Sequence, residues 1–68
     1  MRDQVENNVQ TLRKAKPLTQ EELANAVGVT RQTIIAIEKG NYVPSVALAL
    51  KLAYVLKEPV EHIFNVKQ

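Results

Sequence analysis

Apolar residues recur three and four positions apart in short stretches of the chain, and residues that favour helix ends bound each stretch. This pattern predicts five helices, over residues 8–15, 20–27, 31–39, 46–56 and 59–64. No long linker, internal repeat or low-complexity segment separates them. We therefore expect residues 1–68 to form a single all-α domain.

The second of these helices has the clearest boundaries. Thr19 is followed three residues later by Glu22, the spacing of a capping box, in which the hydroxyl and the carboxylate bind free amides at the helix start. Gly28 follows the last apolar position, where a residue with positive φ commonly ends a helix. The starts of the first, third and fourth helices have suitable capping residues in Asn7 or Asn8, Thr30 and Ser45.

The two ends of the chain leave two interpretations open. Residues 2–6 and 65–68 can pair as a small two-stranded β-ribbon, with Val5 and Val66 as its weak apolar signal. Frayed ends fit the same short, polar segments equally well. The predicted fold is therefore all-α, with or without a terminal ribbon.

The second and third helices together have the layout of a helix-turn-helix, because two short capped helices are joined by a turn of about four residues that contains glycine. Ala24 is small where the second helix must approach its neighbour closely, and Gly28 permits the sharp turn. Larger apolar residues seal the pair against the rest of the domain: Leu23, Val27, Val29, Ile34 and Ile37.

The segment QEELANAVGVTRQTIIAIEKG resembles the XRE or lambda-repressor-like (Cro-type) family of helix-turn-helix regulators. The resemblance continues through NYVPSVALALKLAYVL and KEPVEHIF, so it covers residues 9–64. It implies a five-helix lambda-repressor-like domain, similar to the short stand-alone members of the family. It also implies a transcription regulator, most often a repressor, that binds a double-stranded DNA operator as a homodimer.

The first turn of the third helix is the candidate for reading DNA sequence. If Ile34 and Ile37 face inward, helical periodicity turns Arg31 and Gln32 outward. Arginine pairs with guanine O6 and N7, and glutamine with adenine N6 and N7, while small or apolar side chains contact the thymine methyl group. The predicted base contacts are Arg31, Gln32, Thr33, Ile35 and Ala36.

Contacts to phosphates are expected from the start of the second helix and from the loop after the third. A helix N-terminus offers free amides and a positive dipole end to an anion. The resemblance implies the loop contacts, because the loop after the third helix faces the same DNA strand in relatives. The predicted phosphate contacts are Gln20, Thr30, Lys39, Asn41 and Tyr42. For Tyr42 we expect above all a loop anchor packed on the core, with its hydroxyl reaching a phosphate.

Two further sets of residues are expected to support this site. In some relatives, residues at the places of Arg13 and Glu38 form a salt bridge that orients the third helix, so the resemblance implies this pair here. A self-complementary dimer patch is expected from Leu50, Tyr54, Val60, Ile63 and Phe64. The alternative is that the fifth helix simply folds over the fourth.

The residue inventory argues against catalysis and against a cofactor. The chain has no cysteine, only His62 as histidine, and no Walker A pattern or acidic metal cluster. No signal peptide or bilayer-spanning apolar stretch is visible. We therefore expect a soluble, cytoplasmic protein that is not an enzyme, with no metal, no cofactor, no small-molecule ligand and no membrane partner.

Charge bears on the choice of partner. The net charge of the 68 residues is +2, and basic residues gather in the first two thirds of the chain, which favours a nucleic-acid face there. A protein-interaction or antitoxin-like adaptor built on the same domain is the main alternative, and non-specific nucleoid binding is a third. An adaptor would tolerate acidic residues on the outer face of the third helix, whereas this chain carries Arg31, Gln32 and Lys39 there.

Overall fold

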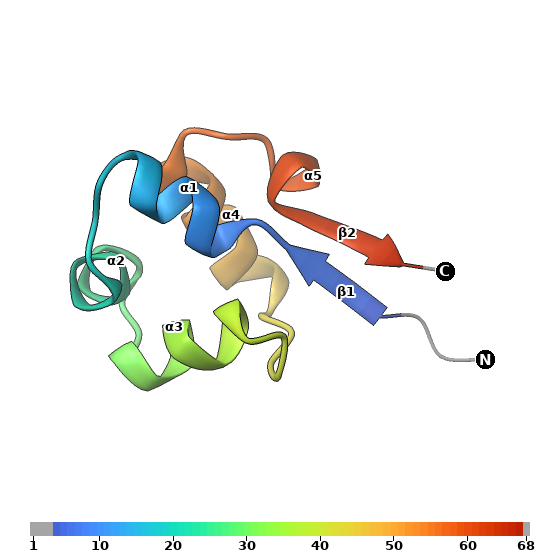
Figure 1. The fold of residues 1–68 in the computed structure, drawn as a ribbon, viewed down its shortest axis with the longest axis horizontal. Helices are drawn as coiled ribbons and strands as arrows, with labels where there is room; N and C mark the ends of the chain where they lie inside the picture. The colour runs from blue at the N-terminus through green and yellow to red at the C-terminus, as the bar shows by residue number, and fades with distance from the viewer. Residues whose placement is uncertain (1–3, 68) are drawn as a thin grey trace.

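The computed structural model describes residues 4–67. Along the chain, a short strand precedes five helices and a second short strand follows them (Figure 1). In chain order, the elements are β1 (Gln4–Asn7), α1 (Val9–Ala15), α2 (Gln20–Val27), α3 (Arg31–Glu38), α4 (Val46–Leu56), α5 (Val60–Ile63) and β2 (Phe64–Lys67). The predicted lambda-repressor-like, all-α fold class is confirmed. The fifth helix is shorter than predicted, because Phe64 already belongs to β2.

The terminal ribbon exists, which settles the choice that the sequence leaves open. β1 and β2 pair antiparallel, with Val5 opposite Val66 and Asn7 opposite Phe64. The Asn8 amide extends this pairing by donating to the Ile63 carbonyl at 2.8 Å. The ribbon projects from the helical body on the side away from α2 (Figure 1). Residues 2, 3 and 68, which the predicted ribbon includes, lie outside the described residues.

All five helices contribute to one apolar core. The buried apolar side chains are Val9, Leu23, Ala24, Val27, Ile34, Ile37, Leu48, Leu52, Leu56 and Ile63. Each larger aliphatic side chain in such a core contributes about 1.5–3 kcal/mol by its removal from water. In a chain of this size that burial has to offset most of the conformational entropy of folding.

Capping interactions fix the start of α2 and the turn that joins α2 to α3. α2 begins with the predicted capping box, in which Thr19 Oγ1 accepts from the Glu22 amide at 3.0 Å and the Glu22 carboxylate accepts from the Thr19 amide at 2.8 Å. Gly28 ends α2 with φ of 77°, and Thr30 Oγ1 caps α3 by accepting from the Thr33 amide at 3.3 Å. Only residues 28–30 connect the two helices. These features agree with the predicted helix ends.

At the start of α1 the structure decides between the two predicted capping residues, whereas the turn that ends α4 has no counterpart in the predictions. Asn8 is the N-cap residue of α1 but makes no side-chain capping bond, whereas the Asn7 Oδ1 atom accepts from the Val9 amide at 3.1 Å. α4 is followed by its C-cap residue Lys57, which adopts the left-handed conformation with φ of 58°. Glycine usually occupies such a position, so the sequence gives no sign of this turn.

Candidate nucleic-acid interface

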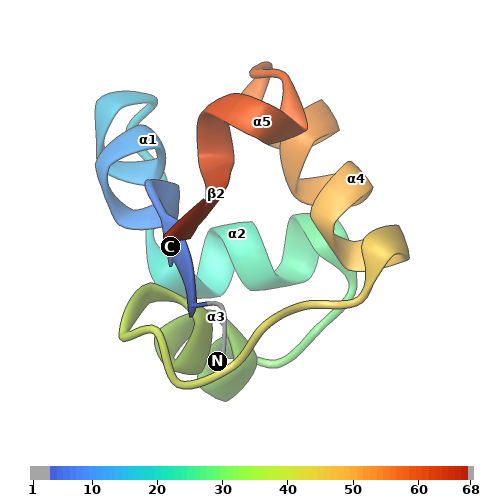
Figure 2. The same cartoon turned by 90° about the vertical axis from the view of Figure 1, so that its right-hand side faces the viewer.

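α3 packs chiefly on α2 and forms the lower edge of the molecule in two perpendicular views (Figures 1 and 2). Its inner face consists of Ile34 and Ile37, which are fully buried. Arg31 and Gln32, in its first turn, are exposed. The corner that they form is therefore open to solvent and uncovered by the described part of the chain.

The other predicted base contacts on α3 are less exposed to solvent than Arg31 and Gln32. Thr33, Ile35 and Ala36 are half-buried. Thr33 Oγ1 lies 3.1 Å from Thr30 Oγ1, so these two hydroxyls are hydrogen-bonded to each other at the start of α3. Both residues thus serve the helix cap as well as the surface that faces outward.

A shallow hollow joins the outer face of α3 to the loop that follows it. Its lining combines predicted base and phosphate contacts: Gln32, Thr33, Ala36, Asn41 and Tyr42. Tyr42 is 46% exposed and does not belong to the core, so its expected role as an anchor packed on the core is wrong. Tyr42 lines this hollow instead.

Backbone bonds close the same loop. Gly40 has φ of 80°, and its amide donates to the Ile37 carbonyl at 2.9 Å. The Asn41 amide donates to the Ala36 carbonyl, also at 2.9 Å. Lys39 and Asn41 are exposed, so their side chains stand free on a loop whose backbone is held in place.

A second hollow lies beside Arg31 at the start of α2. It is lined by Arg13, Thr19, Gln20, Glu21 and Arg31. Gln20 is turned partly inward, because its Nε2 atom donates to Glu38 Oε1 at 3.0 Å. Sequence reasoning misses this bond, since nothing in the spacing of two residues 18 positions apart indicates it.

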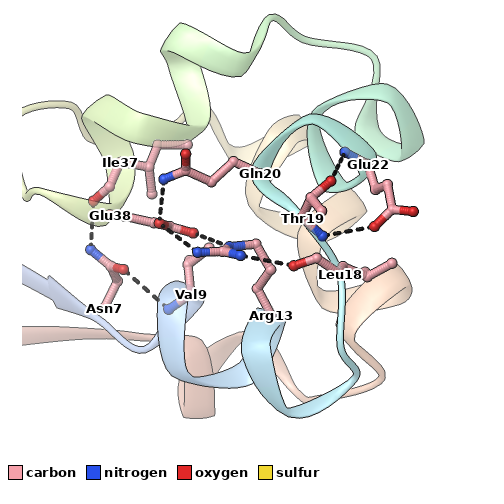
Figure 3. Close-up of polar contacts among 9 residues, drawn as sticks. All are labelled: Asn7, Val9, Arg13, Leu18, Thr19, Gln20, Glu22, Ile37 and Glu38. Carbon is pink, nitrogen blue, oxygen red and sulfur yellow. Dashed lines mark hydrogen bonds and ion pairs between the residues drawn. The ribbon is translucent and has the colours of Figure 1, made fainter.

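Beneath this hollow, a buried ion pair joins α1 to the last turn of α3 (Figure 3). Arg13 Nε donates to Glu38 Oε2 at 2.6 Å and Nη2 donates to Oε1 at 3.3 Å. Arg13 Nη1 donates to the Leu18 carbonyl at 2.8 Å. The two side chains are only 8% and 3% exposed, respectively. The structure thus contains the pair that the resemblance implies, in a nearly buried and bidentate form.

The ion pair also compensates an unfavourable charge at the end of α3. A carboxylate in the last turn of a helix lies near the negative end of the helix dipole, which disfavours it. The Arg13 guanidinium supplies the opposite charge, and Gln20 supplies a further donor. No buried side-chain nitrogen or oxygen in residues 4–67 lacks a hydrogen-bond partner.

The predicted dimer patch is corrected in part. Ile63 is fully buried in the core and has no surface to offer, and Val60 and Phe64 are half-buried. Leu50 and Tyr54 are 56% and 85% exposed, so α5 does not fold over them. Val46, which sequence reasoning overlooks, is 77% exposed one turn before Leu50. Val46 could have been predicted from the sequence, because residues four positions apart, such as Val46 and Leu50, lie on the same face of a helix.

The described residues also bear on two other kinds of site, a metal site and a membrane-spanning helix. Within residues 4–67, His, Cys, Asp and Glu side chains form no group of three that would hold a metal ion. His62 is exposed, with Nδ1 3.3 Å from Glu58 Oε1. None of the helices described between residues 4 and 67 has the length and apolar character needed to cross a bilayer.

Two capped helices, a glycine turn between them and an open outer face on the second define a helix-turn-helix protein. The family model described as Helix-turn-helix matches residues 9–63. The chain belongs to this XRE-type helix-turn-helix family, whose members are DNA-binding transcriptional regulators and not enzymes.

Several relatives match most of the chain. A protein of Methanothermobacter thermautotrophicus, named an uncharacterized HTH-type transcriptional regulator, is 62% identical over 53 residues, which are 76% of this chain and 77% of that protein. YgzD of Bacillus subtilis, with the same description, is 48% identical over 88% of this chain and 91% of its own. The phage CTXphi transcriptional repressor RstR of Vibrio cholerae is 35% identical over 87% of this chain, which spans about half (53%) of RstR.

Solved structures show the same fold. The restriction-modification controller protein C.AhdI of Aeromonas hydrophila superposes with a TM-score of 0.76 and is 34% identical, over 81% of this chain and 83% of its own. A protein from Bacteroides fragilis reaches a TM-score of 0.81 at 23% identity, over 90% of this chain and 98% of its own, and this likeness shows the fold alone.

Proposed function

We propose that this protein is a sequence-specific regulator of transcription that places the outer face of α3 in the major groove of double-stranded DNA. The observation that carries the proposal is the open corner of Arg31 and Gln32 at the N-terminus of α3. The N-terminal residues of a recognition helix are those that reach base edges. Arg31 suits guanine and Gln32 suits adenine, and each such bidentate pair is worth about 1–3 kcal/mol of discrimination.

The neighbouring residues have a different role in this proposal. Thr33, Ile35 and Ala36 face the same groove, where methyl groups of thymine meet small or apolar side chains. Thr30, Lys39, Asn41 and Tyr42 contact phosphates on the two sides of α3. The second side-chain N–H group of Gln20 serves a further phosphate, while the first stays on Glu38. These phosphate contacts set affinity and its dependence on salt, and not the choice of sequence.

The same proposal includes a homodimer and repression. The exposed apolar stripe of α4, formed by Val46, Leu50 and Tyr54, is the surface that a second copy would cover, with Val60 and Phe64 beside it. Two α3 helices about 34–36 Å apart then enter successive major grooves on one side of the DNA. Repression follows where such a site overlaps a promoter, and the relative RstR carries the name of a repressor.

Selection of bound sites from random duplex DNA, followed by sequencing, tests the proposal. The expected result is a near-palindromic motif whose half-sites are centred about one helical turn apart. Enrichment of no motif would support non-specific binding instead. A gel-shift series in rising salt gives the second readout, because phosphate contacts make affinity fall steeply with salt concentration. Weak binding that does not change with salt would favour the adaptor alternative.

A further inference from the structure

We propose that Asn7 is a positioning residue that ties the terminal ribbon to the end of α3, so that DNA affinity depends on the pairing of β1 with β2. This inference rests on the proposed function, because the segment that Asn7 holds leads into the loop of predicted phosphate contacts. Asn7 itself is not expected to touch DNA.

The geometry around Asn7 shows one side chain bound to two helix ends (Figure 3). Its Nδ2 atom donates to the Ile37 carbonyl of α3 at 2.8 Å, and its Oδ1 atom accepts from the Val9 amide of α1 at 3.1 Å. Carbonyls in the last turn of a helix and amides in the first turn have no partner within the helix. Asn7 supplies one partner to each, across a sequence separation of 30 residues in the case of Ile37.

The Ile37 carbonyl is also the acceptor for the Gly40 amide, at 2.9 Å. Asn7 and Gly40 therefore share one oxygen atom at the point where α3 turns into its loop. Fixing this carbonyl fixes the start of the turn, and Lys39 and Asn41 lie directly on either side of Gly40. The position of both side chains relative to α3 thus depends on a bond that comes from the ribbon.

The ribbon in turn holds Asn7. Asn7 lies opposite Phe64 in the strand register, and the next amide, that of Asn8, donates to the Ile63 carbonyl at 2.8 Å. The Asn8 side chain binds separately, from Nδ2 to the His62 carbonyl of α5 at 2.9 Å, and is not one of the bonds that lead from β2 to Asn7. A continuous set of hydrogen bonds therefore runs from β2 through β1 to the loop after α3.

The side-chain chemistry at this position is restrictive, because one group must donate and accept at once. Asparagine does both, whereas aspartate keeps the acceptor for Val9 and loses the donor for Ile37. Asn7→Asp therefore separates the bond to α3 from the bond to α1. Asn8→Ala is the matched control, because it removes an amide one residue away that binds α5 and does not touch α3.

The test measures amide hydrogen exchange of Gly40 and Asn41 by NMR, together with affinity for a duplex obtained by selection. We expect Asn7→Ala and Asn7→Asp to speed exchange at both amides and to weaken duplex binding by about three- to tenfold, the effect of one lost hydrogen bond. Asn8→Ala leaves both quantities as in the unchanged protein. Thr19→Ala, which weakens the start of α2, serves in the exchange measurement alone as the control for lost stability without a loosened loop, because the start of α2 belongs to the proposed DNA-binding surface.

Normal exchange at Gly40 and Asn41 in Asn7→Asp, with unchanged duplex affinity, would overturn the inference. If Asn7→Ala does not fold, Asn7→Asp decides the outcome, because it retains the bond to α1. The two proposals fail differently. If the protein without substitutions binds no duplex, the proposed function is refuted. If it binds DNA but substitution of Asn7 does not change its affinity, only this inference is refuted.

Discussion

Arg13 and Glu38 form a bidentate ion pair that connects α1 to the last turn of α3, at distances of 2.6 and 3.3 Å. Both side chains are almost completely buried, so water does little to screen the two charges. Truncation of one partner would leave the other charge buried without compensation. We therefore expect the pair to hold the end of α3 in place and to make the fold sensitive to either residue.

We expect Arg13→Ala to lower the free energy of unfolding by about 3–5 kcal/mol, because it strands the Glu38 carboxylate in the interior. A domain of this size has about 3–10 kcal/mol in total, so the variant is near the limit of folding. Urea unfolding measures the change. Replacement of both residues by methionine should recover part of the loss, because apolar side chains often replace buried ion pairs without cost, but the Leu18 carbonyl and the Gln20 amide lose their partners.

Lys14→Ala is the control for that experiment, because Lys14 is the exposed neighbour of Arg13. Its effect should stay within about 0.5 kcal/mol. A loss below about 1 kcal/mol for Arg13→Ala would mean that the pair behaves like an exposed one and does not fix α3.

The proposed division between base and phosphate contacts predicts different results for Arg31 and Lys39. Arg31→Ala should cost about 1–3 kcal/mol of binding and relax the preference at one base pair. Lys39→Ala should weaken all sequences alike and lower the slope of log affinity against log salt by about 1. Affinities for a set of single-base variants of the selected site, measured at several salt concentrations, check both. An unchanged preferred sequence in Arg31→Ala would show that Arg31 does not read a base.

The exposed stripe of α4 predicts that a charge at its centre separates the proposed dimer. Leu50→Glu should be monomeric by analytical ultracentrifugation at micromolar concentration, because burial of an unpaired carboxylate is costly. Its affinity for a two-half-site operator should fall by about 100-fold or more, because the second half-site no longer gains from linkage to the first. Thr11→Glu places the same charge on an exposed position of α1 and should change neither property. A dimeric Leu50→Glu protein would exclude this stripe as the interface.

Lys57 has φ of 58° and ψ of 43°, a left-handed conformation that costs a residue with Cβ about 1–2 kcal/mol. Lys57→Gly should therefore stabilise the protein, by about 0.5–1 kcal/mol once the greater freedom of glycine in the unfolded chain is counted. Lys51→Gly, in the middle of α4, should instead destabilise it by about 1 kcal/mol. Thermal or urea unfolding of the two variants would give shifts of opposite sign, and shifts of the same sign would contradict the explanation.

The helix-turn-helix could be predicted from the sequence because its signals are local. Thr19 and Glu22 are three residues apart, and Gly28 lies at the turn that it permits, so short-range chemistry specifies these ends. The inward position of Ile34 and Ile37 follows from helical periodicity, and with it the exposure of Arg31. These features need no knowledge of the rest of the fold.

Features that depend on distant parts of the chain could not be predicted in this way. The ribbon requires α1 and α5 to bring the two ends together, and Val5 and Val66 alone are too weak a signal for it. α5 has only four residues, too few for its periodicity to show that Ile63 faces the core. The bonds of Asn7 to Ile37 and of Gln20 to Glu38 join residues that only the folded chain makes neighbours.

The connection of only three residues between α2 and α3 has a mechanical consequence. Hydrogen bonds fix each side of the turn, with the Val29 amide on the Ala24 carbonyl at 3.0 Å and Thr30 on the first turn of α3. We therefore expect the two helices to move as one unit on the proposed duplex, so that a misfit is relieved in part by bending or twisting of the DNA. Flexible steps such as TA and CA/TG in the untouched centre of an operator would then be preferred, although no side chain reaches them.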